Sequence, residues 1–379
     1  MMRPATSPWE TASHALAVPF VAAALLLGGC GSTDSASTAP TLPVPSTEGL
    51  QEHRGEAQGT TYSIKYVSDD RLEDAVFEDI LEMVDREVNL WRPDSRINAI
   101  NAWNRTDSLF GFVDSTQIIG PLWALSEELH ELTRGAFDPT VSPLVELWGF
   151  GLSEMGKVGE REVDSVMAFV GLLPDRFDMN EEEEDGWYKA TWVRKGDPRA
   201  ALDFNAIAQG YTVDLLMEAL RERDILNAMV ELGGEVVCRG VNPGGEPWRI
   251  AVDRPVEGSG AGDRSFELVV SVRDKAICTS GSYRKFHEVD GRKMSHTIDP
   301  GTGYPAHNGL LSATVMAPTA AYADALATAF MVLGAEQTKG FLSLHAHLGL
   351  DVLLMSDDGA GGYEVWTSPG FDAVSTRPS

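Results

Sequence analysis

The strongest constraint on the fold of this 379-residue chain is an irregular alternation of strand-like and helix-like segments. Residues 55–67 alternate β-prone side chains, which predicts a strand, and residues 71–90 carry apolar side chains at helical spacing, which predicts an amphipathic helix. Further helices are expected over 115–133, from about 206 and over 322–333. The alternation follows no βαβ period and contains no long internal repeat. It therefore predicts a mixed α+β fold of a single domain, with room for two lobes.

Strands are expected between these helices, in runs rich in β-branched and apolar residues. The expected strands are 200–204, 230–238, 248–253 and 266–280. The run of like charge at 181–185 is expected to form the solvated tip of a hairpin.

The N-terminus is expected to be a targeting signal rather than part of the fold. Residues 15–27 form an apolar run of signal-peptide length, which is short for a membrane-spanning helix. The run leads to Leu-Gly-Gly-Cys at residues 27–30, which resembles a bacterial lipobox, where the cysteine is lipidated and becomes the new N-terminus. The leader carries Arg3 but also Glu10, so a buried helix with a chance cysteine stays open as an alternative.

We therefore predict a lipoprotein signal peptide over 1–29, a flexible Ser/Thr/Ala/Pro-rich tether over 30–50 and a catalytic domain over 51–370. A lipid on Cys30 would hold the protein to the membrane outside the cytoplasm, on the periplasmic side of the cell envelope. No other segment approaches about 18 uninterrupted apolar residues, so the rest of the chain is expected to fold in water.

The charge balance argues against nucleic acid as a partner. Lys and Arg number 30 against 57 Asp and Glu, a formal net charge of −27, and the sequence contains no basic stripe. Such a chain repels phosphate backbones. If it handles a phosphorylated ligand, it must recruit cations locally, as a metal ion or as a few placed Lys and Arg.

The cysteine content argues against a zinc site and against a disulfide framework. Beyond Cys30, only Cys238 and Cys278 occur, both in apolar, strand-like runs. We expect two buried thiols, with pairing in an oxidising compartment left open.

One candidate site lies where a predicted strand passes into a helix, at residues 203–211 (DFNAIAQGY). The exposed N–H groups of a helix start can bind a phosphate group. The carboxylate of Asp203 can bond a cofactor or simply cap the helix, and both interpretations stay open.

A second candidate is His296, within residues 295–305. Its imidazole can accept a proton near neutral pH, although a lone His is more often structural than catalytic. Residues 299–303 (DPGTG) have the composition of a turn. The preceding segment 279–284 adds hydroxyl groups and Arg284, which can meet a phosphate.

A third candidate lies within the apolar helix expected over 322–333. Asp324 and Thr328 are four residues apart, so their side chains share one face of that helix. A carboxylate beside a hydroxyl suits a hard cation such as Mg²⁺, and burying the two without a partner would be costly. The alternative is a Thr328 hydroxyl bonded to its own helix carbonyl.

Other phosphate-binding and nucleophile motifs are absent from the sequence. It contains no Walker A motif, no Gly-x-Gly-x-x-Gly after a strand and no Gly-x-Ser-x-Gly elbow. The binding site must therefore use a different scaffold.

Taken in order, these segments resemble the ApbE family, the FAD:protein FMN transferases. The resemblance runs from about residue 55 to about residue 366 and rests on a series of short motifs rather than on one. The matching segments are 59–62 (GTTY), 92–98 (RPDSRIN), 135–141 (GAFDPTV), 143–151 (PLVELWGFG), 203–211, 231–235 (ELGGE), 280–281, 295–296 and 324–328.

The resemblance implies that FAD is the donor substrate, that Mg²⁺ is the cofactor and that a Thr or Ser hydroxyl of a partner flavoprotein is the acceptor. The implied metal ligands are Asp324, Thr328 and the backbone carbonyl of Ala206, with His296 and Asp324 as the catalytic residues. Flavin contacts are implied for Trp91, Ala136, Phe137, Asp138, Asp203, Gln209 and Ile298. The chain departs from the family pattern at Gln58, where relatives usually have Met against the flavin, and at Asn205, which is often Gly.

In the implied reaction, the acceptor hydroxyl attacks the phosphorus on the FMN side of the pyrophosphate and AMP leaves. Magnesium would neutralise the growing negative charge, and His296 would take the hydroxyl proton. Two alternatives remain open: a magnesium-dependent pyrophosphatase that splits FAD into FMN and AMP, and a non-catalytic flavin-binding lipoprotein. Self-modification is a weaker third, because residues 308–314 match the partner proteins' acceptor motif only faintly.

Overall fold

The computed structural model describes residues 49–152, 155–184, 188–255, 266–282, 286–289 and 292–377, all within one compact unit, Val44–Ser379. The predicted signal peptide, Cys30 and the predicted tether up to residue 48 lie outside the described residues. Within the described ranges, no helix combines the length and the apolar character needed to cross a bilayer.

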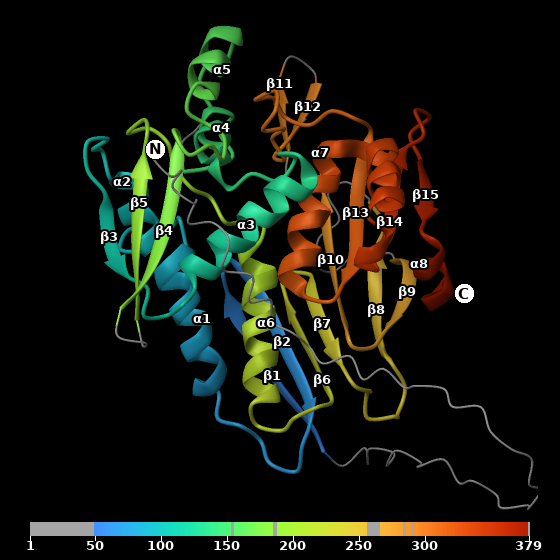
Figure 1. The fold of residues 1–379 in the computed structure, drawn as a ribbon. Helices are drawn as coiled ribbons and strands as arrows, with labels where there is room; N and C mark the ends of the chain where they lie inside the picture. The colour runs from blue at the N-terminus through green and yellow to red at the C-terminus, as the bar shows by residue number, and fades with distance from the viewer. Residues whose placement is uncertain are drawn as a thin grey trace, which may run out of the picture. The chain divides into compact units, whose positions relative to one another are not determined.

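An eight-stranded sheet forms the centre of this unit, and every pair of neighbouring strands in it is antiparallel (Figure 1). In spatial order the strands are β1 (Leu50–Ala57), β2 (Thr60–Val67), β6 (Ala228–Leu232), β7 (Glu235–Arg239), β10 (Lys275–Gly281), β13 (Leu310–Ala317), β14 (Asp351–Asp357) and β15 (Tyr363–Thr367). The interleaved helices and antiparallel strands confirm the predicted mixed α+β fold.

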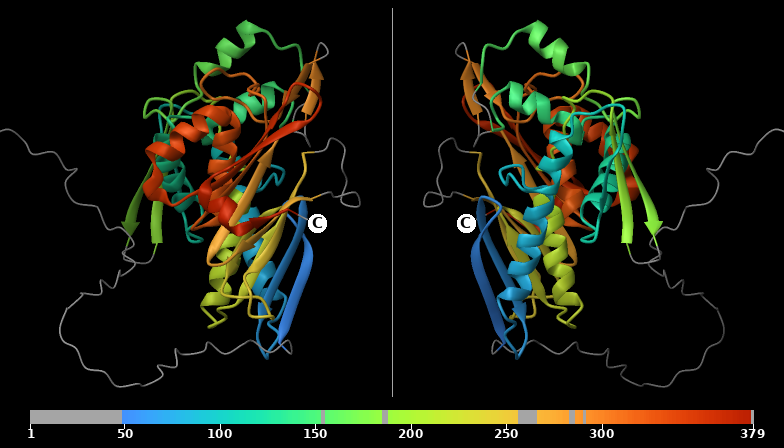
Figure 2. Two further views of the ribbon diagram at one scale, coloured as in Figure 1. Left: turned by 90° about the vertical axis from the view of Figure 1, so that its right-hand side faces the viewer. Right: turned by 90° about the vertical axis from the view of Figure 1, so that its left-hand side faces the viewer.

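Helices cover one face of the sheet, and a smaller sheet covers part of the other (Figure 2). The alternation of side chains along β14 shows both faces: Val352 and Leu354 join the core under the helices, and Leu353 and Met355 join the core under the small sheet. The covering helices are α1 (Ala75–Val88), α6 (Ala208–Arg221) and α7 (Ala320–Leu344). The small sheet consists of β8 (Trp248–Asp253), β9 (Phe266–Val272) and β16 (Ser375–Thr376), with α8 (Pro369–Val374) beside it. Since Phe371 is fully buried there, the fold continues past the predicted boundary at residue 370.

The remaining elements lie beside the main sheet and the helices that cover it (Figure 1). A three-stranded sheet in the order β3, β5, β4 stands next to helix α3, and the β11–β12 hairpin stands near α4 and α5. Their bounds are α2 (Arg96–Ala102), β3 (Phe110–Val113), α3 (Ile119–Thr133), η1 (Pro139–Val141), α4 (Ser142–Leu147), α5 (Glu160–Met167), β4 (Phe177–Glu184), β5 (Tyr188–Lys195), β11 (Phe286–Val289), β12 (Arg292–Ser295) and η2 (Ala346–Leu348).

Two runs that the sequence predicts as continuous strands each form two strands; the first is a hairpin, and the second passes from the small sheet to the main sheet. The predicted strand 230–238 turns at Gly233 and Gly234, whose φ angles of 68° and 115° suit glycine, so it contributes to both β6 and β7. The predicted strand 266–280 turns at Asp274, with a φ of 52°, and contributes to β9 and β10. Both runs look continuous because apolar, β-prone residues stand on each side of the turn.

The long helix α7 contains a break that agrees with the predicted end at residue 333. Gly334 has a φ of 75°, outside the helical range. The side-chain amide of Asn308 donates hydrogen bonds to the carbonyl oxygens of Met331 and Val332, at 2.8 and 3.0 Å. These bonds satisfy carbonyls that the break leaves without a helical partner.

Candidate active site

Helices α6 and α7 meet at the point where the predicted metal ligands lie. A Cβ atom added to Gly210 would stand 2.6 Å from the carbonyl carbon of Ala320 and 2.8 Å from the nitrogen of Ala321, and closer still to the Ala320 oxygen. Only glycine permits this approach of two backbones. The Gly210 N–H uses it to donate a hydrogen bond to Oδ2 of Asp324, at 3.1 Å.

That hydrogen bond leaves the carbonyl of Ala206 available as a ligand. In a regular helix, the Gly210 N–H would donate to the carbonyl oxygen four residues earlier, which is that of Ala206. Because the N–H goes to Asp324 instead, no group in the described part of the chain donates a hydrogen bond to the Ala206 oxygen. A carbonyl oxygen with free lone pairs is a suitable ligand for a hard cation.

The carboxylate of Asp324 is buried, with 6% of the residue exposed, and its neighbours along α7 are buried apolar residues. Burial raises its pKa to about 7, and the nearby charge of Asp214 adds to the rise, while the Gly210 hydrogen bond opposes it. Among the residues that the structure describes, Gly210 alone donates a hydrogen bond to this carboxylate. A buried carboxylate that accepts so few hydrogen bonds is stabilised by a cation beside it.

The hydroxyl of Thr328 lies one helical turn from Asp324 and is not bonded to the helix itself. Its Oγ1 is 3.1 Å from Oγ of Ser280 on β10. No hydrogen bond joins it to the Asp324 carbonyl oxygen within the described structure, so the alternative of a helix-bonded threonine is wrong. Thr328 therefore remains a candidate ligand.

The donor set fits Mg²⁺ rather than a transition metal. A carboxylate, a hydroxyl and a carbonyl are hard oxygen ligands, and Mg²⁺ commonly takes few ligands from protein and the rest from water and substrate phosphates. Across the ranges that the structure describes, no cluster of three or more His, Cys, Asp or Glu side chains is placed to hold a metal ion. Cys238 and Cys278 are separate, buried thiols, as expected.

Pro139, the residue directly after the segment 136–138 that is predicted to contact the flavin, is hydrogen bonded to Asp203. The Asp203 N–H donates to the carbonyl oxygen of Pro139 at 2.7 Å, and Oδ1 of Asp203 accepts from the Asn205 N–H at 2.7 Å. Since α6 begins only at Ala208, Asp203 holds the turn before the helix and does not cap the helix itself. Burial raises its pKa to about 6, despite the Asn205 hydrogen bond.

Asp138 is held in place by residues on both sides of it. Its Oδ1 accepts from the N–H and the hydroxyl of Thr140, at 2.7 and 2.6 Å. Its Oδ2 lies 3.5 Å from Nδ1 of His130 on α3. Burial raises the pKa of Asp138, against these Thr140 bonds. Ala136 and Phe137 beside it are 8% and 3% exposed, so they are largely packed into the core.

Gln209 lies beside the turn between β6 and β7. A Cβ atom on Gly233 would stand 3.2 Å from Nε2 of Gln209 and 2.9 Å from Cγ2 of Thr60. The start of α6, the start of β2 and this turn therefore meet around Gly233, and the turn needs a small residue with a positive φ. The family motifs at 59–62, 203–211 and 231–235 are brought together here.

Three other predicted residues lie in different surroundings. Ile298 is 6% exposed and packs in a small core with Leu144 and Trp148. The ring of His296 makes an edge contact with Phe150, with centroids 6.3 Å apart. Trp91 is 59% exposed, and no hydrogen bond or ring contact in the described structure joins it to the other predicted residues. The structure thus brings Ala206, Gln209, Asp324 and Thr328 to one corner, and it joins Asp203 to Pro139, which directly follows the segment 136–138.

Sequence reasoning missed two residues that position this corner. The carboxylate of Asp214 on α6 accepts hydrogen bonds from the N–H groups of Ala320 and Ala321, at 2.8 and 2.9 Å, and so caps α7. Asp324 was noticed because it is an acidic residue within an apolar helical segment, and Asp214 could have been found in the same way. The side chain of Asn101 bonds both the N–H and the carbonyl of Leu202, directly before Asp203.

Two further sequence observations have structural explanations. Gln58, which departs from the Met that the family resemblance implies at this position, donates from Nε2 to Oγ1 of Thr212 at 2.8 Å and so turns toward α6. Within the faint acceptor-like segment 308–314, Ser312 and Thr314 are 2% and 0% exposed in the main sheet. Their hydroxyls are therefore inaccessible as acceptors, which argues against self-modification.

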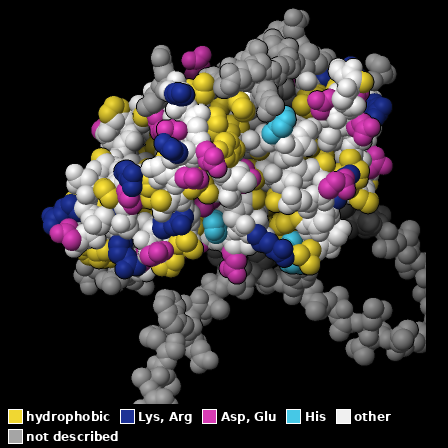
Figure 3. Space-filling model, turned by 90° about the horizontal axis from the view of Figure 1, so that it is seen from above, with side chains coloured by type: hydrophobic (Ala, Val, Ile, Leu, Met, Phe, Trp, Pro, Cys, Tyr) yellow, Lys and Arg dark blue, Asp and Glu magenta, His cyan; other side chains and the backbone are white. Residues whose placement is uncertain are grey.

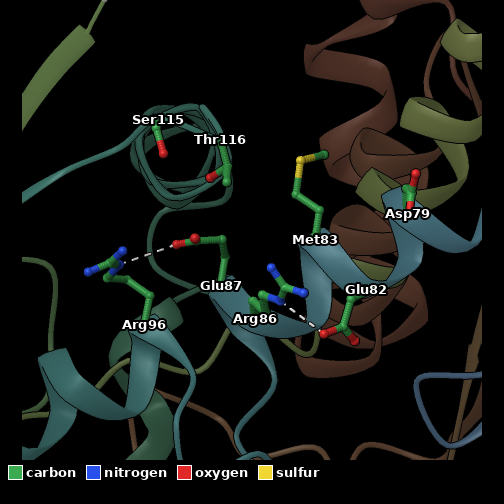
Figure 4. Close-up of a pocket in the computed structure, with 8 residues that line it drawn as sticks. All are labelled: Asp79, Glu82, Met83, Arg86, Glu87, Arg96, Ser115 and Thr116. Carbon is green, nitrogen blue, oxygen red and sulfur yellow. Dashed lines mark hydrogen bonds and ion pairs between the residues drawn. The ribbon is translucent and has the colours of Figure 1, made fainter.

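A polar cavity of about 530 Å³ lies elsewhere, between α1, α2 and the start of α3 (Figure 4). Its wall contains two ion pairs: Arg86 pairs with Glu82, and Nε of Arg96 lies 3.5 Å from Oε2 of Glu87. None of the predicted site residues lines it. We therefore place the candidate active site at the α6–α7 corner and not in this cavity.

The face seen from above in Figure 3 carries hydrophobic side chains gathered near its centre, with Asp, Glu, Lys and Arg interspersed around them. No continuous basic stripe crosses this face. It lacks the electrostatic footprint of a nucleic-acid surface.

The fold and the oxygen-lined corner describe an enzyme site that suits a phosphorylated ligand, and comparison with known proteins identifies the family. The ApbE family model matches residues 58–354. The FAD:protein FMN transferase of Vibrio cholerae is 34% identical over 319 residues, which cover 82% of this chain and 89% of that protein. The protein of the same name from Haemophilus influenzae is 32% identical over 313 residues, covering 80% and 86%.

The three-dimensional structure agrees with the sequence comparisons. It is similar to the solved structure of the flavin transferase ApbE from Vibrio cholerae, with a TM-score of 0.70 and 31% identity, over 86% of this chain and 99% of that one. The chain belongs to the ApbE family. It is an enzyme, and its class is that of the transferases.

Proposed function

We propose that this enzyme transfers FMN from FAD to a Thr or Ser hydroxyl of an acceptor flavoprotein and releases AMP. The names of its relatives support FAD as the donor and a protein as the acceptor. The observation that carries the proposal is the corner formed by Asp324, Thr328 and the Ala206 carbonyl. An acidic chain needs a local cation to hold a pyrophosphate, and this corner supplies the oxygen ligands for one.

Magnesium held by these three residues would offset the negative charge that grows on the phosphate oxygens. The chain's own groups would bind and orient the donor: the hydrogen-bonded segment 136–138, Asp203 beside it, and Gln209 at the start of α6. His296 would accept the proton of the acceptor hydroxyl as the new O–P bond forms and the P–O bond to AMP breaks. Trp91 and Ile298 would complete the surroundings of the flavin nucleotide.

The test is substitution of Asp324 by Asn, which keeps the size of the side chain and removes its charge. We expect D324N to lose most magnesium-dependent FAD binding and to leave no fluorescent acceptor band on a denaturing gel, because Mg²⁺ loses its only carboxylate ligand. E336Q is the control, since Glu336 is an exposed acid of the same helix that pairs with Lys339. Normal transfer by D324N would contradict the metal assignment. Rapid AMP release by the wild type without acceptor would favour the pyrophosphatase.

We also propose that Cys30 carries a lipid that anchors the enzyme to the membrane on the periplasmic side. The support is the apolar run at 15–27, the lipobox-like sequence at 27–30 and the polar stretch that precedes β1. Replacement of Cys30 by Ala should move the protein from the membrane fraction to the soluble periplasmic fraction. Unchanged membrane association of C30A would refute the anchor.

A further inference from the structure

Strand β10 presents a hydroxyl to the helix that carries the proposed metal ligands. Ser280 lies on the face of β10 that packs on α7, as does Cys278, whose Sγ is 3.5 Å from the carbonyl oxygen of Ala320. The Ser280 Oγ is 3.1 Å from Oγ1 of Thr328. Two hydroxyls at this distance form one hydrogen bond, in which either can be the donor.

Other helical threonines of this chain show what Thr328 would do without Ser280. The hydroxyls of Thr133, Thr212 and Thr338 each donate to the carbonyl oxygen four residues earlier, at 2.7, 2.7 and 2.8 Å. This is the usual bond of a threonine inside a helix. Thr328 differs from these three in having a strand hydroxyl within reach.

We infer that Ser280 is a positioning residue of the proposed metal site, where its Oγ accepts a hydrogen bond from the Thr328 hydroxyl. The inference rests on the proposed function. A hydroxyl that coordinates a cation must direct a lone pair at it and its proton elsewhere. With the proton donated to Ser280, the Thr328 oxygen keeps its lone pairs for the metal. A bond to its own helix would instead hold the hydroxyl in an orientation set by the backbone.

The same strand offers a matched control. Thr279 is the neighbour of Ser280 and faces the opposite side of the sheet, where its hydroxyl is 2.8 Å from that of Thr314. Replacing Thr279 by Val removes a hydroxyl pair from the same strand without touching Thr328. A general effect of losing a strand hydroxyl should therefore appear equally in T279V and S280A.

The experiment measures magnesium affinity by calorimetry, with full-length protein saturated with FAD and no acceptor present. Removing a group that orients a metal ligand typically weakens metal binding by roughly 10–100-fold. We expect S280A to bind Mg²⁺ at least about tenfold more weakly, T279V to stay within about twofold of wild type, and S280T to recover most of the affinity. S280A should add little to the loss caused by T328V, because Ser280 acts through Thr328.

The outcomes separate the inference from the proposed function. If wild type binds Mg²⁺ and S280A binds it equally well, the role of Ser280 is refuted while the metal site stands. Full additivity of S280A and T328V would also refute it, since Ser280 would then act independently of Thr328. If wild type binds no Mg²⁺ in the presence of FAD, the metal site fails, and the inference fails with it.

Discussion

Replacing Gly210 by Ala tests the closeness of α6 and α7 directly. An added methyl group would stand 2.6 Å from the Ala320 carbonyl carbon and 2.8 Å from the Ala321 nitrogen, well inside contact distance. The obstructing atoms are backbone, so one helix must shift by about an ångström. Such overpacking typically costs about 1–3 kcal/mol, and clashes with backbone lie at the upper end.

The cost is partly offset by helix propensity, because Ala is about 0.8–1 kcal/mol better than Gly inside a helix. We therefore expect G210A to lower the free energy of unfolding by about 2 kcal/mol. For a folded unit of about 330 residues the unfolding entropy is about 0.7 kcal/mol/K, so the melting temperature should fall by about 3 °C.

The assay is urea denaturation of G210A beside G340A, which serves as the control. Gly340 also lies within α7, but a Cβ atom added there meets no atom within 4 Å. G340A should therefore gain about 0.8–1 kcal/mol from helix propensity alone. If G210A is stabilised as G340A is, the two helices do not cross as closely as described, and the explanation of the Gly210–Asp324 bond is wrong.

Two further predictions concern the residues that support the site. Burial raises the pKa of Asp214 to about 6, so the folded protein binds this proton more tightly than the unfolded chain, and this group makes stability decrease as the pH rises from about 4 to about 6. D214N should flatten that part of the pH profile measured by urea unfolding; an identical slope in the variant would contradict the assignment. N101A should lower the free energy of unfolding by about 2–4 kcal/mol, because the N–H and the carbonyl of buried Leu202 both lose their hydrogen-bond partner. The control is N104A: Asn104 is exposed, so this change should alter the free energy of unfolding by less than about 0.5 kcal/mol. Equal denaturation midpoints for N101A and N104A would refute the stabilising role of the Asn101 side chain.

Local sequence patterns predicted those parts of the fold that depend on residues close together in the sequence. The spacing of Asp324 and Thr328 identified a shared helix face, and the apolar run ended at residue 333, where Gly334 breaks α7. The same reasoning failed at 230–238 and 266–280, because β-prone apolar residues on both sides of a short turn make two strands look like one. Glycine pairs such as Gly233-Gly234 were the available signal for the first turn.

Contacts between distant segments could not be predicted from periodicity. Ser280 and Thr328 are 48 residues apart, and Gly210 and Asp324 are 114 residues apart. Whether these groups meet depends on how α6, α7 and β10 pack, which no local pattern encodes. The family resemblance indicated which segments belong to the site, and the structure shows which of them meet at the α6–α7 corner.

The double attachment between α6 and α7 has a consequence for how a ligand enters. Asp214 holds the first residues of α7, and Gly210 holds Asp324 one turn further on, so sliding either helix would break all three hydrogen bonds at once. The two helices are therefore expected to move as one rigid unit at the base of the proposed site. We therefore expect any motion that admits a dinucleotide to occur outside this pair of helices, in exposed side chains such as Trp91, which is 59% exposed.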